Sequence, residues 1–205
     1  MIDLYTWGTP NGRKVSVALE ELGLQYQVFP INITKDEQFA PDFLKISPNN
    51  KIPAMVDHEP PWGGAAYSLF ESGAILIYLA DKCGKLIPPS AQGRYDCLQW
   101  LMFQMGGLGP MLGQAHHFRR FAPEQLPYAI KRYTDEAARL YRVMDKRLGE
   151  AEYLAGDYSI ADIASYPWIT RHEWQGQDLA NFANLRRWYQ AIAARPAVKR
   201  GFEVP

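Results

Sequence analysis

The chain lacks several features that mark particular protein classes. It has only two cysteines, Cys83 and Cys97, and their spacing fits neither a redox pair nor a zinc site. We expect both to be buried structural thiols, so the sequence itself supplies no obvious sulfur for redox chemistry. Lys+Arg and Asp+Glu both number 22, and this zero net charge argues against a nucleic-acid partner bound by bulk electrostatics.

Long apolar segments are missing as well. No run approaches the roughly 20 apolar residues of a membrane-spanning helix, and the start of the chain does not have the pattern of a secretory signal. We therefore expect a cytoplasmic protein without a membrane partner. Apolar residues make up 47% of the chain and charged residues 21%, which is typical of a globular protein.

The four histidines do not form a metal-ligand pattern. His116 and His117 are adjacent, so on a helix they point about 100° apart, and no carboxylate or further histidine follows at ligand spacing. His58 and His172 each precede a glutamate, but neither has a second histidine four residues later. The sequence predicts no metal site.

The first part of the chain alternates between strand and helix patterns. Strands are expected at 2–7, 26–33, 52–56 and 66–70, and helices at 15–22, from 34 onward and at 72–82. Gly23 is a suitable C-terminal cap for the first helix, and Thr34-Lys35-Asp36-Glu37 has the capping-box pattern for the second, with Gln38 in its first turn. The resulting order, βαβαββα, predicts a thioredoxin-like domain over residues 1–84.

The second part of the chain is predicted to be an all-α helical bundle over residues 91–205. A linker with Pro88-Pro89 precedes it, and strand patterns then fade. Gly106 to Pro110 should kink or break a long helical stretch. Ser159-Ile160-Ala161-Asp162 is a further capping box, and a last helix should run from 185 to 194 and stop at Arg195-Pro196.

Two short motifs in the first domain carry the strongest functional signal. Ile52-Pro53 opens a short strand and predicts a cis-proline turn that exposes the backbone groups of Ile52. Glu71-Ser72 heads an apolar helix and offers a carboxylate, a hydroxyl and free backbone N–H groups at the positive end of the helix dipole. Together they suit a zwitterionic peptide, a description that glutathione fits. Glu71-Ser72 alone would be an ordinary helix start, and only the neighbouring Pro53 favours a ligand site.

These motifs make the chain resemble the cytosolic glutathione transferase superfamily over almost its whole length. The resemblance rests on Asn50 to Ala54, Glu71-Ser72 and the cap at 159–162. It is greatest for the bacterial nu-class branch, whose members reduce disulfides with glutathione. The residues that favour this branch are Thr9-Pro10-Asn11-Gly12, Ser47 to Pro53 and Gly106 to Met111.

The resemblance implies a glutathione site in the first domain, a co-substrate cleft completed by the helical domain, and a homodimer. Ile52, beside Pro53, would pair its backbone with the cysteinyl unit, and Glu71 with Ser72 would hold the γ-glutamyl end. A further set of polar residues would contact the sulfur or the tripeptide: Thr9, Asn11, Gln38 and Arg132. Without the resemblance, Thr9 and Asn11 would be helix caps, and Gln38 and Arg132 solvated surface residues.

The residues proposed to face the sulfur differ from those of the commoner transferase classes. Thr9 and Asn11 stand where those classes place a Tyr, Ser or Cys. Both side chains can donate a hydrogen bond to a thiolate, but neither can act as a base near neutral pH. We therefore expect glutathione-dependent disulfide exchange, with reduced or oxidised glutathione as co-substrate. Two alternatives are a transferase that conjugates glutathione to small electrophiles and a non-catalytic binding module of the same fold.

Overall fold

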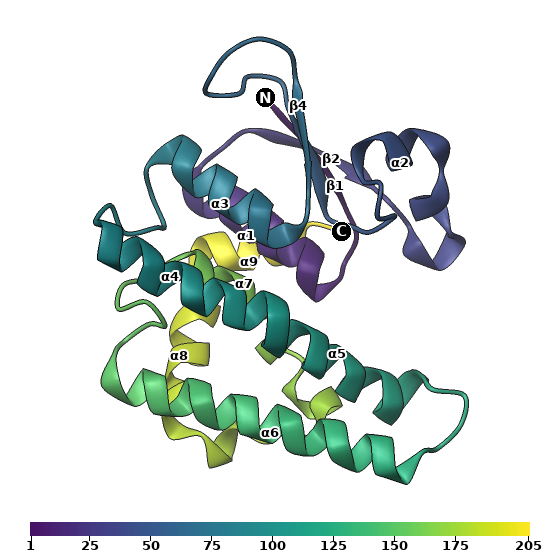
Figure 1. The fold of residues 1–205 in the computed structure, drawn as a ribbon, viewed down its shortest axis with the longest axis vertical. Coiled ribbons are helices and arrows are strands. Elements are labelled where there is room, and N and C mark those ends of the chain that lie inside the picture. Colours follow the sequence, from purple (N-terminus) through teal and green to yellow (C-terminus); the bar gives the residue numbers. More distant parts are fainter. The chain divides into compact units, whose positions relative to one another are not determined.

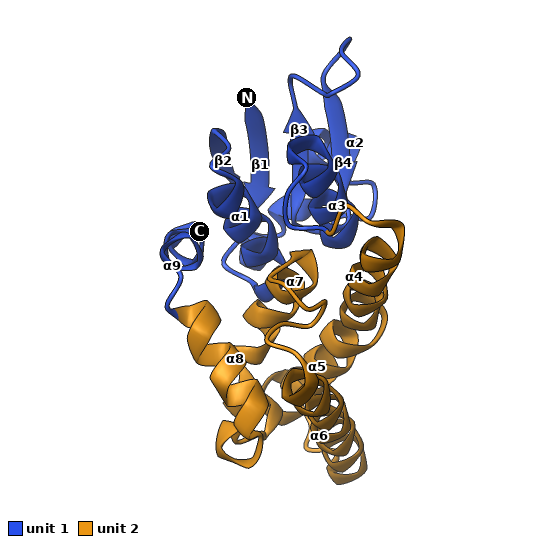
Figure 2. Ribbon diagram, turned by 90° about the vertical axis from the view of Figure 1, so that its left-hand side faces the viewer, with its two compact units in different colours: residues 1–87, 194–205 blue, residues 88–193 orange.

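The computed structural model describes all of residues 1–205, which form two compact units. The first consists of residues 1–87 together with 194–205, and the second of residues 88–193 (Figure 2). Each unit is considered by itself below.

A four-stranded mixed sheet with helices forms the first unit (Figure 1). In chain order its main elements are β1 (Ile2–Thr6), α1 (Pro10–Leu22), β2 (Tyr26–Pro30), α2 (Pro41–Ile46), β3 (Ala54–Asp57), β4 (Tyr67–Phe70) and α3 (Ser72–Cys83). The strand order is β2-β1-β3-β4, with β1 parallel to β2 and antiparallel to β3. The predicted βαβαββα arrangement is therefore confirmed.

Local sequence signals account for the ends of α1. Thr9 is the N-cap, Pro10 occupies the first turn, and Gly23 ends the helix with a left-handed φ of 67°. Glycine adopts this conformation without the steric cost that a side chain adds. The apolar face of α1, with Val15 and Leu19 fully buried, packs on α3.

The expected helix from Thr34 onward takes a different form. Two 3₁₀ turns, Ile33–Lys35 and Glu37–Phe39, precede α2 and are separated by Asp36 at a φ of 60°. Asn32, rather than Thr34, is the cap, because its Oδ1 accepts a hydrogen bond from the Thr34 N–H at 3.0 Å. The Glu37 carboxylate in turn accepts from the Asn32 N–H at 2.6 Å, so the cap lies two residues earlier than predicted while its carboxylate partner is the predicted Glu37.

The last residues of the chain, 194–205, fall within the predicted helical domain, 91–205, but belong to the first unit of the structure. The helix predicted at 185–194 ends before Arg195-Pro196 as expected, but it is not the last one, because Pro196 begins another helix, α9 (Pro196–Glu203), which packs on α1. Ser16 Oγ donates to the Gly201 carbonyl at 2.6 Å, and Arg195 makes a bidentate pair with Glu21 at 2.6 and 2.9 Å. These contacts place residues 194–205 in the first unit rather than in the helical one.

The second unit is entirely helical, apart from two isolated bridges between residues 153 and 157. Its main helices are α4 (Ala91–Phe103), α5 (Gly109–His116), α6 (Pro127–Glu150), α7 (Ile160–Ile169) and α8 (Ala183–Ala193). Between α4 and α5 a π-helical turn, Gln104–Leu108, replaces the predicted break, and Pro110 lies in the first turn of α5. The helical backbone runs through Leu108 and Gly109 into α5, so Pro110 lies inside a continuous helical stretch, directly after the π-helical turn at which that stretch departs from regular α-helical hydrogen bonding.

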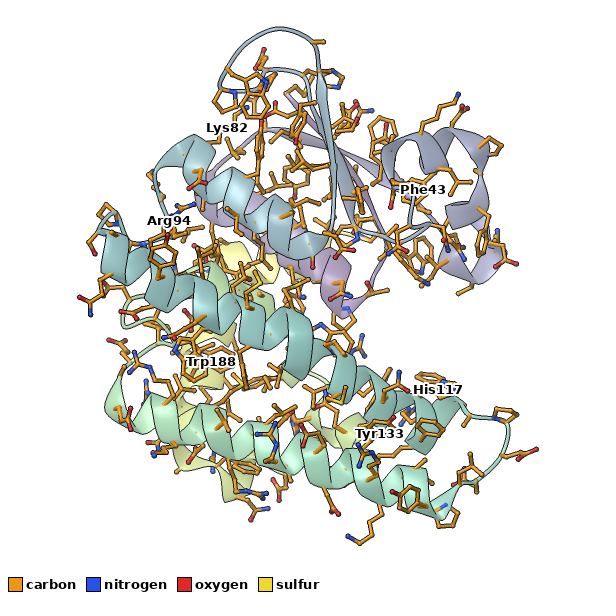
Figure 3. The ribbon with its side chains drawn as sticks, viewed as in Figure 1. Phe43, Lys82, Arg94, His117, Tyr133 and Trp188 are labelled. Carbon is orange, nitrogen blue, oxygen red and sulfur yellow. The ribbon has the colours of Figure 1, made fainter.

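The core of this unit is organised around Asp162, which is fully buried at the start of α7. The capping box predicted at Ser159 is confirmed, since the Ser159 N–H donates to the Asp162 carboxylate at 3.0 Å. Trp188, labelled in Figure 3, is also fully buried, and its Nε1 donates to Asp162 Oδ1 at 2.8 Å. Burial raises the pKa of the Asp162 carboxyl to about 6, although hydrogen bonds from Leu154, Trp188 and Ser159 act in the opposite direction.

Candidate functional site

The register of the sheet brings the predicted motifs to one end of the first unit. Tyr5 pairs with Ala54, and Ala54 pairs with Phe70. The chain therefore leaves β1 toward Thr9, enters β3 from Ile52-Pro53, and leaves β4 toward Glu71-Ser72 at the same end of the sheet. Because β2 is parallel to β1, the chain toward Gln38 also leaves β2 at this end.

Thr9 lies at the turn between β1 and α1. Its Oγ1 accepts a hydrogen bond from the Gly12 N–H at 3.2 Å, which is the N-cap geometry. Since this bond uses only a lone pair, the Thr9 O–H can still donate. Asn11 is half-buried in the first turn of the same helix. The two side chains thus lie at the positive end of the α1 dipole.

Gly12 holds this turn against the end of β1. A Cβ added at Gly12 would lie 2.3 Å from the carbonyl oxygen of Trp7 and 2.5 Å from Oγ1 of Thr6. No rotamer could relieve the contact with the Trp7 carbonyl, because both groups belong to the backbone. The close approach positions the helix start that carries Thr9 and Asn11.

The peptide bond between Ile52 and Pro53 is cis, as the sequence predicts. The ladder of β3 begins at Ala54, so the backbone groups of Ile52 lie outside its strand pairing. Ile52 is half-buried and Pro53 is buried. An extended peptide could therefore pair with the backbone of Ile52, as a strand added to a sheet does.

Glu71 and Ser72 form the start of α3. Glu71 is exposed and has a φ of 71° and a ψ of 111°, a backbone conformation that a non-glycine residue rarely adopts. Ser72 is buried, with 4% of its surface exposed. Strained backbone of this kind persists where the surrounding structure holds it, often at ligand sites. The dipeptide in the sequence gave no signal of this conformation.

Lys14 is a residue of this region that the sequence reasoning missed. It lies on α1 with 1% of its surface exposed, and its Nζ is 3.4 Å from Oγ of Ser72. Burial lowers the pKa of Lys14 to about 7, although the charge of Glu71 acts to raise it. A usable signal was present, because Lys14 shares the helix face of Val17 and Ala18, which predicts burial.

Gln38 lies in the second 3₁₀ turn after β2. Its Nε2 makes only a long contact of 3.5 Å with Oδ1 of Asp36, and its Oε1 is buried with no hydrogen-bond partner in the chain. A buried acceptor without a partner is unfavourable, so this oxygen is suited to accept a hydrogen bond from a ligand.

Arg132 belongs to the second unit, where it is exposed on α6. It lines a cavity of about 720 Å³ together with Tyr128, Lys131 and Arg142. In the same cavity Lys131 pairs with Asp135 at 2.5 Å.

Neither cysteine belongs to the turns that carry the motifs. Cys83 is the last residue of α3, about 16 Å along that helix from Ser72 at 1.5 Å per residue. Cys97 is fully buried in α4 of the second unit. Burial raises the pKa of both thiols, which makes them weaker nucleophiles at neutral pH.

Other kinds of site receive no support from the structure. No group of three or more His, Cys, Asp or Glu side chains is arranged to hold a metal ion. None of the helices combines the length and apolar character that a membrane span needs. His116 is buried, and its Nε2 lies 2.9 Å from Nε2 of Gln175, so it belongs to the core of the second unit.

The arrangement at the sheet end favours an anionic or zwitterionic peptide. Two helix N-termini, the Thr9 and Ser72 hydroxyls and the unpaired strand edge at Ile52 supply donors, and the Glu71 carboxylate supplies a partner for an ammonium group. A sulfur atom placed beside Thr9 and Asn11 would meet donors and no base.

Comparison with known protein families gives two matches. Residues 1–81 match the family described as glutathione S-transferase, N-terminal domain, and residues 110–196 match glutathione S-transferase, C-terminal domain. Among curated proteins, the disulfide-bond oxidoreductase YfcG of Escherichia coli K12 is 52% identical over 198 residues, which cover 96% of this chain and 92% of YfcG.

Solved structures show the same similarity. A glutathione transferase family member from Pseudomonas fluorescens Pf-5, with two glutathione bound, aligns with a TM-score of 0.94 at 48% identity and covers 100% of this chain and 93% of its own. A glutathione transferase from Pseudomonas putida, with one glutathione disulfide bound per subunit, also has a TM-score of 0.94. It is 44% identical, and the alignment covers 100% of this chain and 91% of that protein.

Proposed function

This chain belongs to the glutathione S-transferase family, and on that premise we propose that it is a glutathione-dependent disulfide-bond oxidoreductase without a catalytic cysteine of its own. The observation that carries the proposal is the sheet end where Thr9 and Asn11, Ile52-Pro53 and Glu71-Ser72 come together. The similarity to YfcG, a disulfide-bond oxidoreductase by name, supports the same activity.

Each residue at this end has a proposed role toward the tripeptide. Ile52, preceding the cis Pro53, pairs its backbone with the cysteinyl unit. Glu71 binds the ammonium of the γ-glutamyl end, and Ser72 binds its carboxylate. Gln38 and Arg132 are proposed as further polar contacts, Gln38 through its buried Oε1 and Arg132 on the resemblance alone.

The sulfur lies beside Thr9 and Asn11, which stabilise its thiolate form. A cysteine thiol has a pKa near ~8.5, and a helix N-terminus or nearby donors lower it. Each pKa unit of lowering corresponds to about 1.4 kcal/mol of preferential stabilisation of the thiolate. The Thr9 hydroxyl, the Asn11 amide and the α1 dipole act in this direction without removing the proton themselves.

The reaction is two consecutive thiol–disulfide exchanges. The thiolate of the first glutathione attacks one sulfur of the substrate disulfide, which forms a mixed disulfide and releases the other sulfur as a thiolate that takes up a proton. A second glutathione thiolate then attacks the glutathione sulfur of the mixed disulfide and releases the second thiol. The substrate gains two electrons, and two glutathione molecules become glutathione disulfide. The same donors stabilise the attacking and the leaving thiolate.

The test compares glutathione-dependent reduction of a small disulfide, bis(2-hydroxyethyl) disulfide, by wild type, Thr9→Ala and Asn11→Ala. A hydrogen bond to a charged group contributes about 1.5–3 kcal/mol, so each substitution should lower kcat/KM by roughly ten- to a hundredfold. The matched control is the Cys83→Ser/Cys97→Ala double variant, which should retain the wild-type rate.

Two outcomes would contradict the assignment. Full activity in both Thr9→Ala and Asn11→Ala would show that these residues do not serve the sulfur, and loss of activity in the cysteine-free variant would show that a protein thiol takes part. Faster conjugation of 1-chloro-2,4-dinitrobenzene than reduction of the disulfide would favour the transferase alternative.

The assembly, class and location complete the proposal. We assign the chain to the nu class on the Thr9 to Gly12 and Gly106 to Met111 motifs. We also propose a homodimer, which size-exclusion chromatography with light scattering tests directly. A cytoplasmic location follows from the reaction, because the cytosolic glutathione pool is kept reduced.

A further inference from the structure

Two arginines of the second unit meet on one tryptophan, Trp174. Arg120 belongs to the π-helical turn His117–Phe121, whose first residue is labelled in Figure 3. Arg171 directly precedes the 3₁₀ turn His172–Gln175, which contains Trp174. Each guanidinium carbon lies 4.4 Å from the ring centroid of Trp174. One indole therefore holds two guanidinium groups near each other.

The chain does not neutralise these two guanidinium groups. Neither makes an ion pair, and neither donates a hydrogen bond. Glu173, an exposed residue of the same 3₁₀ turn, is paired with neither of them. Burial lowers the pKa of His116, and the positive charges of Arg171 and Arg120 lower it further. Two like charges are thus held together without a counter-charge.

Stacking on an aromatic ring leaves the donors of an arginine free. The guanidinium is planar and its N–H groups lie in its plane, so a contact through its face uses none of them. Arg120 is exposed, and Arg171 and Trp174 are half-buried. The contact with Trp174 therefore restricts both side chains while their donors remain available to a ligand. The π-helical turn that carries Arg120 is a feature frequently found at functional sites.

The charge of this cluster favours a dianion. A phosphate monoester carries roughly −1.5 to −2 at neutral pH and has three acceptor oxygens, so it can accept hydrogen bonds from both guanidinium groups. A single carboxylate carries one negative charge and would neutralise only one of the two arginines.

Phe121 adds an apolar surface beside the arginines. It is 61% exposed, and its ring centroid lies 6.0 Å from that of Trp174 at an interplanar angle of 72°. An aromatic group attached to the phosphate can pack against this ring while the phosphate meets the arginines. Free phosphate gains nothing from Phe121.

We propose that Arg120 and Arg171 form a binding site for the phosphate monoester of a small aromatic group, with Trp174 holding the two guanidinium groups and Phe121 packing against the aromatic group. The inference is independent of the proposed reaction with glutathione, because that reaction assigns no role to these four residues.

The experiment uses phosphorus NMR titrations of the protein with phenyl phosphate and with inorganic phosphate, at low ionic strength, to measure both Kd values. Arg120→Met and Arg171→Met remove the donors but keep a side chain that can contact Trp174. Each should raise the Kd of phenyl phosphate by about tenfold, the effect of losing a hydrogen bond to a charged group. Phe121→Ala should weaken the binding of phenyl phosphate and leave that of inorganic phosphate unchanged.

Arg186→Met is the matched control, because Arg186 is another exposed arginine of the second unit, on α8. This variant should bind both ligands as wild type does. Arg120→Lys keeps the charge but loses the planar fork of donors, so its Kd should lie between those of wild type and Arg120→Met.

Failure of the wild type to bind phenyl phosphate would overturn the inference. Unchanged affinity in Arg120→Met and Arg171→Met would do so as well, since the ligand would then bind elsewhere. An equal loss in Arg186→Met would indicate a general attraction by surface charge, and an equal effect of Phe121→Ala on both ligands would remove the aromatic contact; either result rejects the site. If Arg171→Met does not fold, by circular dichroism, the exposed Arg120→Met decides alone.

Discussion

His116 should make the stability of this protein depend on pH. The Gln175 side-chain amide donates to Nε2 of His116 at 2.9 Å and to the Trp168 carbonyl at 2.7 Å, while its Oε1 accepts from the Tyr141 hydroxyl at 2.5 Å. The amide cannot turn over without losing these bonds, so Nε2 of His116 must be unprotonated. A protonated Nε2 would place two donors against each other.

The surroundings of the His116 ring also favour its unprotonated form by lowering its pKa. Burial, followed by the positive charges of Arg171 and Arg120, lowers the pKa of His116 to about 4 from its ordinary value of 6.5. Between these pH values the unfolded chain binds more protons than the folded one, so the free energy of unfolding falls as the pH falls. At about 1.4 kcal/mol per pKa unit, the loss between pH 7.5 and pH 4.5 is roughly 2 to 3 kcal/mol.

Urea unfolding of wild type and His116→Gln, at several pH values and one protein concentration, measures this contribution. Gln cannot titrate, so the stability difference between the two proteins should change by roughly 2 to 3 kcal/mol across this range. His117→Gln is the matched control, since the side chain of His117 is exposed and its replacement should leave the pH dependence as in wild type. Parallel curves for wild type and His116→Gln would refute the reasoning.

Two further predictions concern residues with local structural roles. Gly12→Ala should destabilise the first unit by about 1–3 kcal/mol and weaken retention on immobilised glutathione, because its Cβ would lie 2.3 Å from the Trp7 carbonyl. Gly106→Ala is the matched control: no atom lies within 4 Å of its Cβ, and thermal unfolding should show an equal or higher midpoint. Ser159→Ala should lower the free energy of unfolding by ~1 kcal/mol through loss of the N-cap, and an unchanged midpoint would contradict the capping role.

Short-range patterns predicted most of the elements and motifs correctly. Alternating residues in β1, the glycine cap at Gly23, the cis bond at Pro53 and the capping box at Ser159 all depend on neighbours within a few positions. The βαβαββα order and the helical second part follow from the same patterns. Where two local signals competed, prediction was less accurate, and the cap at Asn32 was mistaken for one at Thr34.

Short-range sequence patterns predicted only some of the residues and contacts of the candidate site. Glu71 and Ser72 were identified as a dipeptide, but the positive φ of Glu71, between β4 and α3, had no signal in the sequence. The position of Lys14 on the apolar face of its helix predicts that the side chain is buried, but it does not predict which residue the side chain contacts. The contact with Ser72 joins residues 58 positions apart, and it exists because α1 packs on α3 beside the same sheet.

The residues of this chain thus specify its turns, caps and helix faces, since those depend on the conformational preferences of adjacent residues. Tertiary structure decides the strand register that aligns Tyr5, Ala54 and Phe70. This register in turn brings Thr9, Ile52 and Ser72 to one end of the sheet. It also returns α9 to α1, where Ser16 bonds Gly201 across 185 positions. Such pairings depend on the packing of whole elements, which no local run of residues encodes.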